Sequence, residues 1–380
     1  MSKVENIIYK FINKWIKSVD LFNLSLILLM VMFGVLFVTT ASPNVAKIKG
    51  LSDFYFIKKH YFFVFISIFS ILIFSILSIS GIIKISYIGA LLSFLLIFIL
   101  LYLNLENNGS VRWLKLGGFS FQPSEFLKPF IIIIFSFLLT YPKRFKIFNH
   151  LIEGKFIAFL LLFLVSLLLI SQPNFSMFVI VFLVFSTQYF LVGINFKWAF
   201  IMLISIIIFT CSAYYGINHV KYRIDSFFNP KKIHYQVEKS LEAYQSGGIL
   251  GKGPGAGTVK KNIPDSHTDF IFPVIAEEYG AIVCIAIILT IFTIFFRGLY
   301  QISKSNSSFK VCSCTGLLAL FLFQALINIA VSMKLIPTTG VTLPFISYGG
   351  SSLISMGIVM GMMLALTRKE FGKKGLIYDY

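Results

Sequence analysis

Acidic residues are scarce in this chain of 380 residues, which has 15 Asp and Glu against 33 Lys and Arg. Charged residues of all kinds make up only 13% of the sequence, whereas 57% is hydrophobic and 44 residues are Phe. Soluble globular domains carry about 25% charged residues. This composition excludes an ordinary soluble domain and indicates an integral membrane protein.

Cysteine is also rare, with four residues that all fall within apolar segments: Cys211, Cys284, Cys312 and Cys314. Cys312 and Cys314 lack the spacing of metal ligands and have no nearby histidine. The sequence therefore gives no sign of a disulfide framework or a cysteine metal cluster, and we expect the four side chains to pack as small apolar groups.

Apolar runs long enough to cross about 30 Å of hydrocarbon recur along the chain. There are ten: 21–40, 61–83, 85–104, 124–141, 156–171, 175–194, 198–217, 270–296, 311–333 and 346–367. The sequence predicts an all-α, polytopic membrane protein of about ten transmembrane helices. The spans leave room for one sizeable loop, so we expect a single membrane domain over residues 1–380.

Lys and Arg are concentrated in alternate loops, as the positive-inside rule describes. With both termini in the cytoplasm, the inner segments carry more than twice as many basic residues as the short outer loops. Residues 1–20 and 368–380 are then cytoplasmic tails, and the long loop 218–269 faces outward. The first 20 residues are polar and no cleavage site follows the first apolar run, so we expect no cleavable signal.

The net charge of +18 has two explanations. Cytoplasmic basic residues beside anionic lipid account for about half of the cations. The outer loop carries a further set: Lys221, Arg223, Lys231, Lys232, Lys239, Lys252, Lys260 and Lys261. A basic outer vestibule suits an anionic substrate such as a lipid-linked phosphate, whereas nucleic acid is not an expected partner outside the membrane.

Asp269 lies where the long loop meets an apolar run, within Pro264–Phe272. Because an ionisable group at a membrane is costly, such residues are functional candidates. The alternative is an N-cap or a solvated loop acid. Upstream, the glycine-rich sequence that begins at Lys252 could let the loop close over a substrate.

Pro123 and Ser124 predict a helix start, after which Glu125 and Lys128 share one helix face at i, i+3. The two charges could form a structural pair, or they could line a polar cavity reached by a phosphate-bearing headgroup. Just above, Arg112 could fork onto pyrophosphate, and Trp113 could anchor at the interface or stack on a sugar.

Two prolines and several glycines interrupt the apolar sequence of residues 335–352. Broken backbone near membrane depth is tolerated only where it is buried in protein or lines a cavity. Glu277 and Glu278 lie about two turns into the eighth span, and we expect at least one of them to face the bundle interior.

Three motifs in order resemble the SEDS family (shape, elongation, division and sporulation) over residues 20–367. They are Arg112-Trp113 with Gln122-Pro123-Ser124-Glu125, His267-Thr268-Asp269-Phe270-Ile271-Phe272 with Glu277-Glu278-Tyr279-Gly280, and Pro344-Phe345-Ile346-Ser347-Tyr348-Gly349-Gly350-Ser351-Ser352. Thr342 within Gly340–Pro344 and the Lys252 loop resemble the cell-division branch more than the elongation branch. Asn174 is a departure, since the family usually carries an acid there.

The resemblance implies a peptidoglycan glycosyltransferase that polymerises lipid II at the outer membrane face by inverting transfer, with undecaprenyl pyrophosphate as leaving group. Asp269 matches the family's essential acid and would be the general base. Cations near the leaving group, or a divalent Mg²⁺ or Mn²⁺, would neutralise the pyrophosphate, and no organic cofactor is expected. The residues we expect in the substrate cavity are Arg112, Trp113, Glu125, Lys128, Lys252, His267, Glu277, Ser347 and Ser351.

The resemblance also implies a class B penicillin-binding protein transpeptidase and other division proteins as partners, in the cytoplasmic (inner) membrane at the division septum. Two other functions stay open, a lipid II flippase and a scaffold that activates a transpeptidase without catalysis of its own. A flippase should need polar residues through the whole membrane depth. The functional charges gather in the outer half, which favours polymerisation.

Overall fold

The computed structural model describes residues 3–103, 111–116, 119–141, 145–147, 150–193, 196–216, 218–229 and 235–369. Residue 217, at the end of the predicted span 198–217, lies outside this part of the chain, as do residues 230–234 of the predicted outer loop, which include Lys231 and Lys232. So do residues 1–2 and 370–380 of the predicted cytoplasmic tails.

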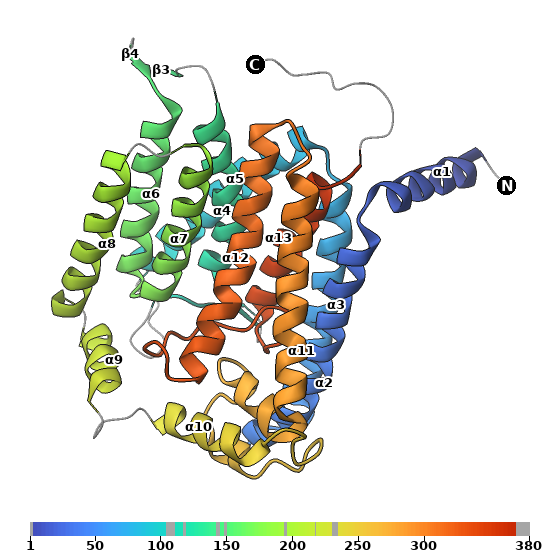
Figure 1. Cartoon of the computed structure of the whole chain (residues 1–380), viewed down its shortest axis with the longest axis vertical. Helices are drawn as coiled ribbons and strands as arrows, with labels where there is room; N and C mark the ends of the chain where they lie inside the picture. The colour runs from blue at the N-terminus through green and yellow to red at the C-terminus, as the bar shows by residue number, and fades with distance from the viewer. Residues whose placement is uncertain are drawn as a thin grey trace.

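Ten long helices run side by side in the described part of the chain and confirm the expected all-α, multi-pass architecture (Figure 1). They are α2 (Leu21–Ile48), α3 (Tyr55–Ile76), α4 (Ile79–Tyr102), α5 (Pro123–Thr140), α6 (Gly154–Ser171), α7 (Phe175–Leu191), α8 (Phe196–Gly216), α11 (Ile271–Ile302), α12 (Ser308–Ser332) and α13 (Gly350–Leu366). Seven of the ten, α2 to α6 with α11 and α12, are long and apolar enough to cross a membrane. Helices α7 and α13 are apolar but shorter.

Smaller elements lie at the two ends of the bundle (Figure 1). Helix α1 (Lys3–Ser18) and the hairpin of β3 (Phe145–Ile147) with β4 (His150–Ile152) lie at the end that the basic residues assign to the cytoplasm. The outer end holds the hairpin of β1 (Leu114–Leu116) with β2 (Phe119–Phe121), the helices α9 (Asn218–Phe228) and α10 (Tyr235–Gly247), and the 3₁₀ turn η2 (Val259–Asn262).

Helices α5 and α12 form the interior of the bundle. In their apolar stretches 83% and 78% of the residues are buried, against 28% in both α4 and α11. Close packing of α13 on α3 depends on two glycines spaced as Gly-x-x-x-Gly. A Cβ at Gly357 would lie 2.6 Å from the Ser67 carbonyl oxygen, and one at Gly361 would lie 2.8 Å from that of Ile71. Small residues let membrane helices approach in this way.

The outer loop is folded onto the bundle rather than extended. Its apolar side chains form a small cluster with the start of α11 and the end of α12: Val237, Ala243, Val259, Ile263, Phe270 and Val331. Ser240 Oγ also donates a 2.6 Å hydrogen bond to the carbonyl of Ser332. The loop therefore holds a defined surface around the residues that precede α11.

Candidate active site

Asp269 lies at the outer end of the bundle, two residues before α11 begins at Ile271. Its side chain is half-buried, and its backbone oxygen accepts a 2.8 Å hydrogen bond from Asn328 Nδ2. The same nitrogen donates to the carbonyl of Val341 at 2.6 Å. Asn328, on α12, therefore joins the seam between loop and membrane to the non-helical segment between α12 and α13.

This segment, residues 333–349, has no helix, as its prolines and glycines predicted. It borders the Asp269 carboxyl group. A Cβ at Gly340 would lie 3.6 Å from Asp269 Oδ2, and the φ of +77° there favours glycine. The neighbouring carbonyl of Thr339 accepts hydrogen bonds from Ser176 Oγ at 2.7 Å and from the Arg223 guanidinium at 3.4 Å. The segment thus positions Arg223 close to the carboxylate.

Four charged groups influence one another at this site. Burial raises the pKa of Asp269 to about 6, Asp265 adds to the rise, and the Arg223 cation opposes it. Burial, together with repulsion by Arg223, lowers the pKa of Arg112 to about 10. Because the Arg223 and Arg112 guanidinium groups repel each other, an anionic ligand beside them would be favourable.

Arg112 is held by the turn between α6 and α7. Its Nε donates to the carbonyl of Gln172 at 3.0 Å, and its terminal nitrogen donates to the carbonyl of Pro173. Asn174 follows, at the position where the resembling family carries an acid, and its Nδ2 donates to Ser124 Oγ at 3.4 Å. A carboxylate at this position could bond the Ser124 hydroxyl only as acceptor, whereas Asn174 donates to it.

Glu125 and Lys128 form the ion pair that their spacing predicted, with 2.7 Å between Lys128 Nζ and Glu125 Oε2. Both side chains are almost fully buried, at 5% and 1% exposed. Lys128 Nζ also donates to Gln324 Oε1 at 2.9 Å, and Gln324 Nε2 donates to Ser352 Oγ at 3.2 Å. The pair belongs to a polar network between α5, α12 and α13, and its role toward a substrate stays a prediction.

Four other predicted site residues have defined places. The His267 ring packs 4.5 Å from the ring of Phe56, and burial lowers the pKa of His267 to about 3, with Lys49 adding to the shift. Ser347 Oγ donates to the carbonyl of Thr268 at 2.7 Å, next to Asp269 in the chain.

Ser351 Oγ accepts from the backbone nitrogen of Gln122 at 2.9 Å, so it joins the starts of α13 and α5. Trp113 is 37% exposed beside Arg112. Ser351 thus has a structural partner, whereas the Trp113 ring is accessible at the outer end.

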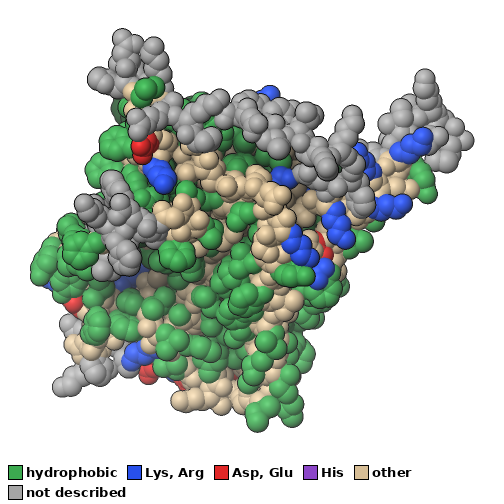
Figure 2. Space-filling model, turned by 45° about the horizontal axis from the view of Figure 1, so that its top comes forward, with side chains coloured by type: hydrophobic (Ala, Val, Ile, Leu, Met, Phe, Trp, Pro, Cys, Tyr) green, Lys and Arg blue, Asp and Glu red, His purple; other side chains and the backbone are tan. Residues whose placement is uncertain are grey.

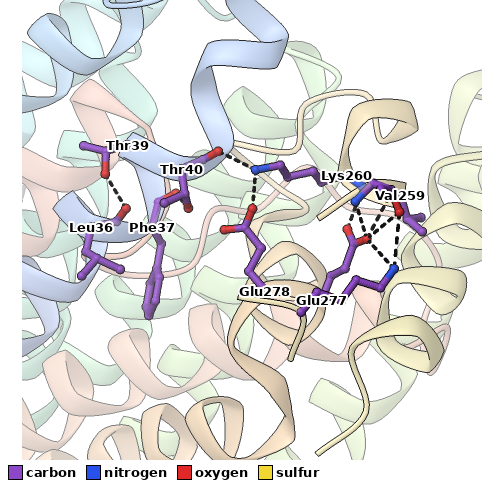
Figure 3. Close-up of polar contacts among 10 residues, drawn as sticks. Leu36, Phe37, Thr39, Thr40, Val259, Lys260, Glu277 and Glu278 are labelled. Atoms are coloured by element: carbon purple, nitrogen blue, oxygen red, sulfur yellow. Dashed lines mark hydrogen bonds and ion pairs between the residues drawn. The ribbon is translucent and has the colours of Figure 1, made fainter. Parts of the chain in front are cut away.

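Glu277 and Glu278, at least one of which was expected to face the bundle interior, are both buried and hold the outer loop onto α11 (Figure 3). The Glu277 carboxylate accepts from the backbone nitrogens of Thr258, Val259 and Lys260 at 2.7, 2.9 and 2.8 Å. Such a set of donors stabilises the ionised form of a carboxylate. We call this arrangement the loop clamp. It consists of Glu277 and Glu278 with their hydrogen-bond and ion-pair partners in residues 252–260.

Lysines complete the loop clamp. Lys252 Nζ lies 3.3 Å from Glu277 Oε1, and Lys260 Nζ forms an ion pair with Glu278 while donating to the carbonyl of Thr40 at 2.9 Å. The structure therefore brings the predicted residues Lys252 and Glu277 together, but as partners of each other. The donors of the clamp face the protein rather than an open ligand site.

The backbone of α11 is interrupted at Gly280, where φ is 78° and ψ is 177°. Residues 248–253 complete the hydrogen bonds that the interruption leaves open. The nitrogens of Lys252 and Gly253 donate to the carbonyls of Glu277 and Glu278, both at 2.9 Å. The nitrogens of residues 281 and 282 donate to the carbonyls of residues 248 and 249 at 3.0 and 3.4 Å. The loop is thus inserted into the helix that follows Asp269.

Replacing Gly280 by alanine should detach this insertion. A Cβ there would lie 2.2 Å from the carbonyl oxygen of Ile249, and residues other than glycine avoid this backbone conformation at a cost of about 1–3 kcal/mol. We expect Gly280→Ala to lower the unfolding temperature and to expose residues 252–261 to trypsin. Gly255→Ala is the matched control, because Gly255 also has φ 78° but no atom near an added Cβ. Equal effects of the two substitutions would show that the insertion contributes nothing.

Arg223 is the functional candidate that the sequence did not single out. It is one of eight basic residues in the outer loop, and only its packing beside Thr339 and Asp269 distinguishes it. Gln324 and Asn328 were also missed. Their signal is two amides spaced at i, i+4 in the last three turns of a largely apolar span, α12.

No group of three or more His, Cys, Asp or Glu side chains that could hold a metal ion occurs among the described residues. Mg²⁺ commonly binds through one or two carboxylates together with substrate phosphates. Asp269, with Arg223 nearby, would be the carboxylate available to such an ion, and substrate oxygens would be its further ligands.

Comparison with known proteins identifies the family. The model of the FtsW/RodA/SpoVE cell cycle proteins matches residues 21–371. A probable peptidoglycan glycosyltransferase FtsW of Caulobacter vibrioides is 36% identical over 363 residues, which cover 95% of this chain and 92% of the relative. The FtsW of Buchnera aphidicola, with the same description, is 34% identical over 83% of this chain and 92% of the relative.

Solved structures show the same fold. The rod shape-determining protein RodA of Thermus thermophilus covers 92% of this chain and 96% of its own, with a TM-score of 0.66 and 21% identity. A chain from a structural study of polymerization and crosslinking by a peptidoglycan synthase complex covers 92% and 97%, with a TM-score of 0.71 and 21% identity. The chain belongs to the FtsW/RodA/SpoVE family, on the FtsW branch that its motifs predicted.

Proposed function

We propose that this protein is a peptidoglycan glycosyltransferase that polymerises lipid II at the outer face of the cytoplasmic membrane, at the division septum. The observation that carries the proposal is a carboxyl group with a raised pKa, Asp269, beside Arg223 and near Arg112 at the outer end of the bundle. The description of the relatives as peptidoglycan glycosyltransferases supports it.

The reaction needs a base and an anion-binding group. An acceptor sugar hydroxyl attacks the anomeric carbon of a lipid-linked sugar, the bond to the pyrophosphate oxygen breaks, and the configuration inverts. Asp269 takes the hydroxyl proton, and a base with a pKa near the working pH is suited to this step. Arg223 and Arg112 stabilise the negative charge of the departing undecaprenyl pyrophosphate. A bound Mg²⁺ or Mn²⁺ would supply further neutralisation of that charge.

The interior of the bundle disfavours the flippase alternative. Beyond Glu125 and Lys128, α5 continues with five buried apolar residues, Ile131 to Phe135. A cavity of about 700 Å³ lies past them at the cytoplasmic end, lined by Glu153, Lys155 and Asn306 among others. This apolar stretch of α5 lies between the cavity and the outer charges, whereas translocation of a charged headgroup needs a continuous polar path.

A reconstituted assay tests the proposed function. The protein is purified, placed in lipid nanodiscs and supplied with fluorescent lipid II, and the products are separated on a gel. We expect a ladder of glycan strands. Transfer of labelled lipid II across liposomes without any strands would favour the flippase. A folded protein that makes no strands and transfers no lipid II would favour the scaffold.

We expect a class B penicillin-binding protein to raise the rate of polymerisation, even when its transpeptidase site is blocked. A partner that binds the active arrangement of the outer loop more tightly shifts the population toward it. The measurement is strand synthesis at saturating lipid II with the wild-type partner, the blocked partner or none. Equal rates in all three reactions would contradict the prediction.

A further inference from the structure

Helix α1 carries apolar side chains that no part of the described protein covers. It extends over 16 residues, Lys3–Ser18, immediately before the span that begins at Leu21. Tyr9, Ile12 and Ile16 are 59%, 46% and 38% exposed. At 1.5 Å per residue the helix is about 24 Å long, and its lysines make it too polar to cross a membrane.

The lysines of α1 lie on the opposite side from its apolar residues. Lys10, Lys14 and Lys17 are spaced at i, i+4 and i+7, which places them along one face. Ile12 and Ile16 are spaced at i, i+4 and lie together on another face. A helix with apolar residues on one side and lysines on the other is typical of helices that lie in the plane of a membrane interface.

The attachment of α1 fixes its place at the cytoplasmic end. Trp15 Nε1 donates to Ser75 Oγ at 3.1 Å, near the end of α3. Asp20, just after the helix, accepts two hydrogen bonds from Arg297 of α11, at 2.7 and 2.8 Å. From this anchored end α1 extends sideways, away from the bundle (Figure 1). Basic side chains are visible along this arm and the adjoining end of the bundle (Figure 2).

We propose that α1 is an interfacial helix that binds the anionic lipid surface of the cytoplasmic leaflet. The apolar face, with Tyr9, Ile12 and Ile16, enters the boundary between headgroups and acyl chains. The lysines Lys10, Lys14 and Lys17 contact anionic headgroups, whose surface potential attracts basic residues. Continuity with a transmembrane helix and opposite charge favour lipid as the occupant over a protein.

Spin labels at single cysteines test this placement in the full-length protein. The background carries Cys211→Ser, because Cys211 is exposed whereas Cys284, Cys312 and Cys314 are buried. Labels are placed at Ile12→Cys and Ile16→Cys on the apolar face and at Asn13→Cys on the polar face. Their accessibility to oxygen and to a water-soluble nickel chelate is measured in nanodiscs of phosphatidylcholine, with and without phosphatidylglycerol.

We expect labels at residues 12 and 16 to be accessible to oxygen and protected from the chelate, and the label at residue 13 to show the reverse. Phosphatidylglycerol should strengthen the protection, and added salt should weaken it. The triple variant Lys10→Gln, Lys14→Gln, Lys17→Gln should lose the response to phosphatidylglycerol. The matched variant Lys58→Gln, Lys115→Gln, Lys261→Gln makes the same charge change on exposed outer residues and should keep it.

Three results would overturn the proposal. Chelate access at all three positions would place α1 in water. Protection from both reagents at residues 12 and 16 would show a protein contact, such as a second copy of the chain. Protection that phosphatidylglycerol and the lysine substitutions leave unchanged would exclude binding to anionic lipid.

Discussion

Asp269→Asn should abolish glycan polymerisation while leaving the protein folded in the membrane. Asparagine has nearly the same shape but cannot accept the proton of the attacking hydroxyl, and loss of a general base costs about 100- to 10,000-fold in rate. The fold should survive, because the contact that fixes this residue is made by its backbone oxygen with Asn328. The measurements are the rate of strand synthesis from labelled lipid II and the unfolding temperature of the purified protein.

Asp265→Asn is the matched control for this prediction. Asp265 belongs to the same loop, but it is exposed and its nearest cation is Lys49 at 3.8 Å. Its φ of 54° lies in the left-handed region, which asparagine tolerates. We expect this variant to keep strand synthesis. Wild-type activity in a well-folded Asp269→Asn protein would exclude Asp269 as the base.

The pH dependence of the reaction should follow the raised pKa of Asp269. A base works only when it is ionised, so kcat/KM should fall as the pH drops through about 6, where half of the Asp269 carboxyl groups become protonated. Asp265 contributes to the raised pKa, so Asp265→Asn should move this fall to lower pH. Arg223 opposes the rise, so Arg223→Gln should move it to higher pH. Identical pH profiles in all three proteins would show that another group controls the acid limb.

The sequence predicted the helical spans well because lipid requires long apolar runs whatever the tertiary contacts are. Their boundaries were less accurate. The second and third spans were expected at 61–83 and 85–104, whereas the helices are Tyr55–Ile76 and Ile79–Tyr102. The chain turns at Ser78, whose side chain accepts a hydrogen bond from the nitrogen of Gly81. A hydropathy profile does not detect such a cap, since the residues on both sides are apolar.

The part of the candidate site that depends on residues close together in the sequence was predictable. Asp269 at the seam and the i, i+3 pair of Glu125 and Lys128 need only local information. Arg223 and the interruption at Gly280 could not be found in this way. Their roles depend on segments about 30 to 115 positions apart in the chain that fold against each other, such as Thr339 for Arg223 and residues 248–253 for Gly280.

Neutralising one member of the Glu125–Lys128 pair should be strongly destabilising. Both side chains are buried, so Glu125→Gln leaves an uncompensated ammonium group and Lys128→Met an uncompensated carboxylate. Removing one partner of a buried ion pair costs about 3–5 kcal/mol. The double variant removes both charges and should recover most of the lost stability, apart from the bond between Lys128 and Gln324. The measurement is the unfolding temperature of the wild type, both single variants and the double variant.

The Lys239–Glu242 pair provides a matched control, because it has the same i, i+3 spacing and a 2.6 Å contact, but its side chains are 23% and 49% exposed. Neutralising either residue there should change the unfolding temperature little, since solvent already satisfies the charges. Strand synthesis then separates the two roles of the buried pair. If Glu125 and Lys128 only hold the bundle together, the double variant should regain activity along with stability. We expect it to remain inactive, because the network that ends at Ser352 loses the charges that we assign to the substrate cavity. Stable and active single variants would show that these charges face solvent and that no such cavity exists.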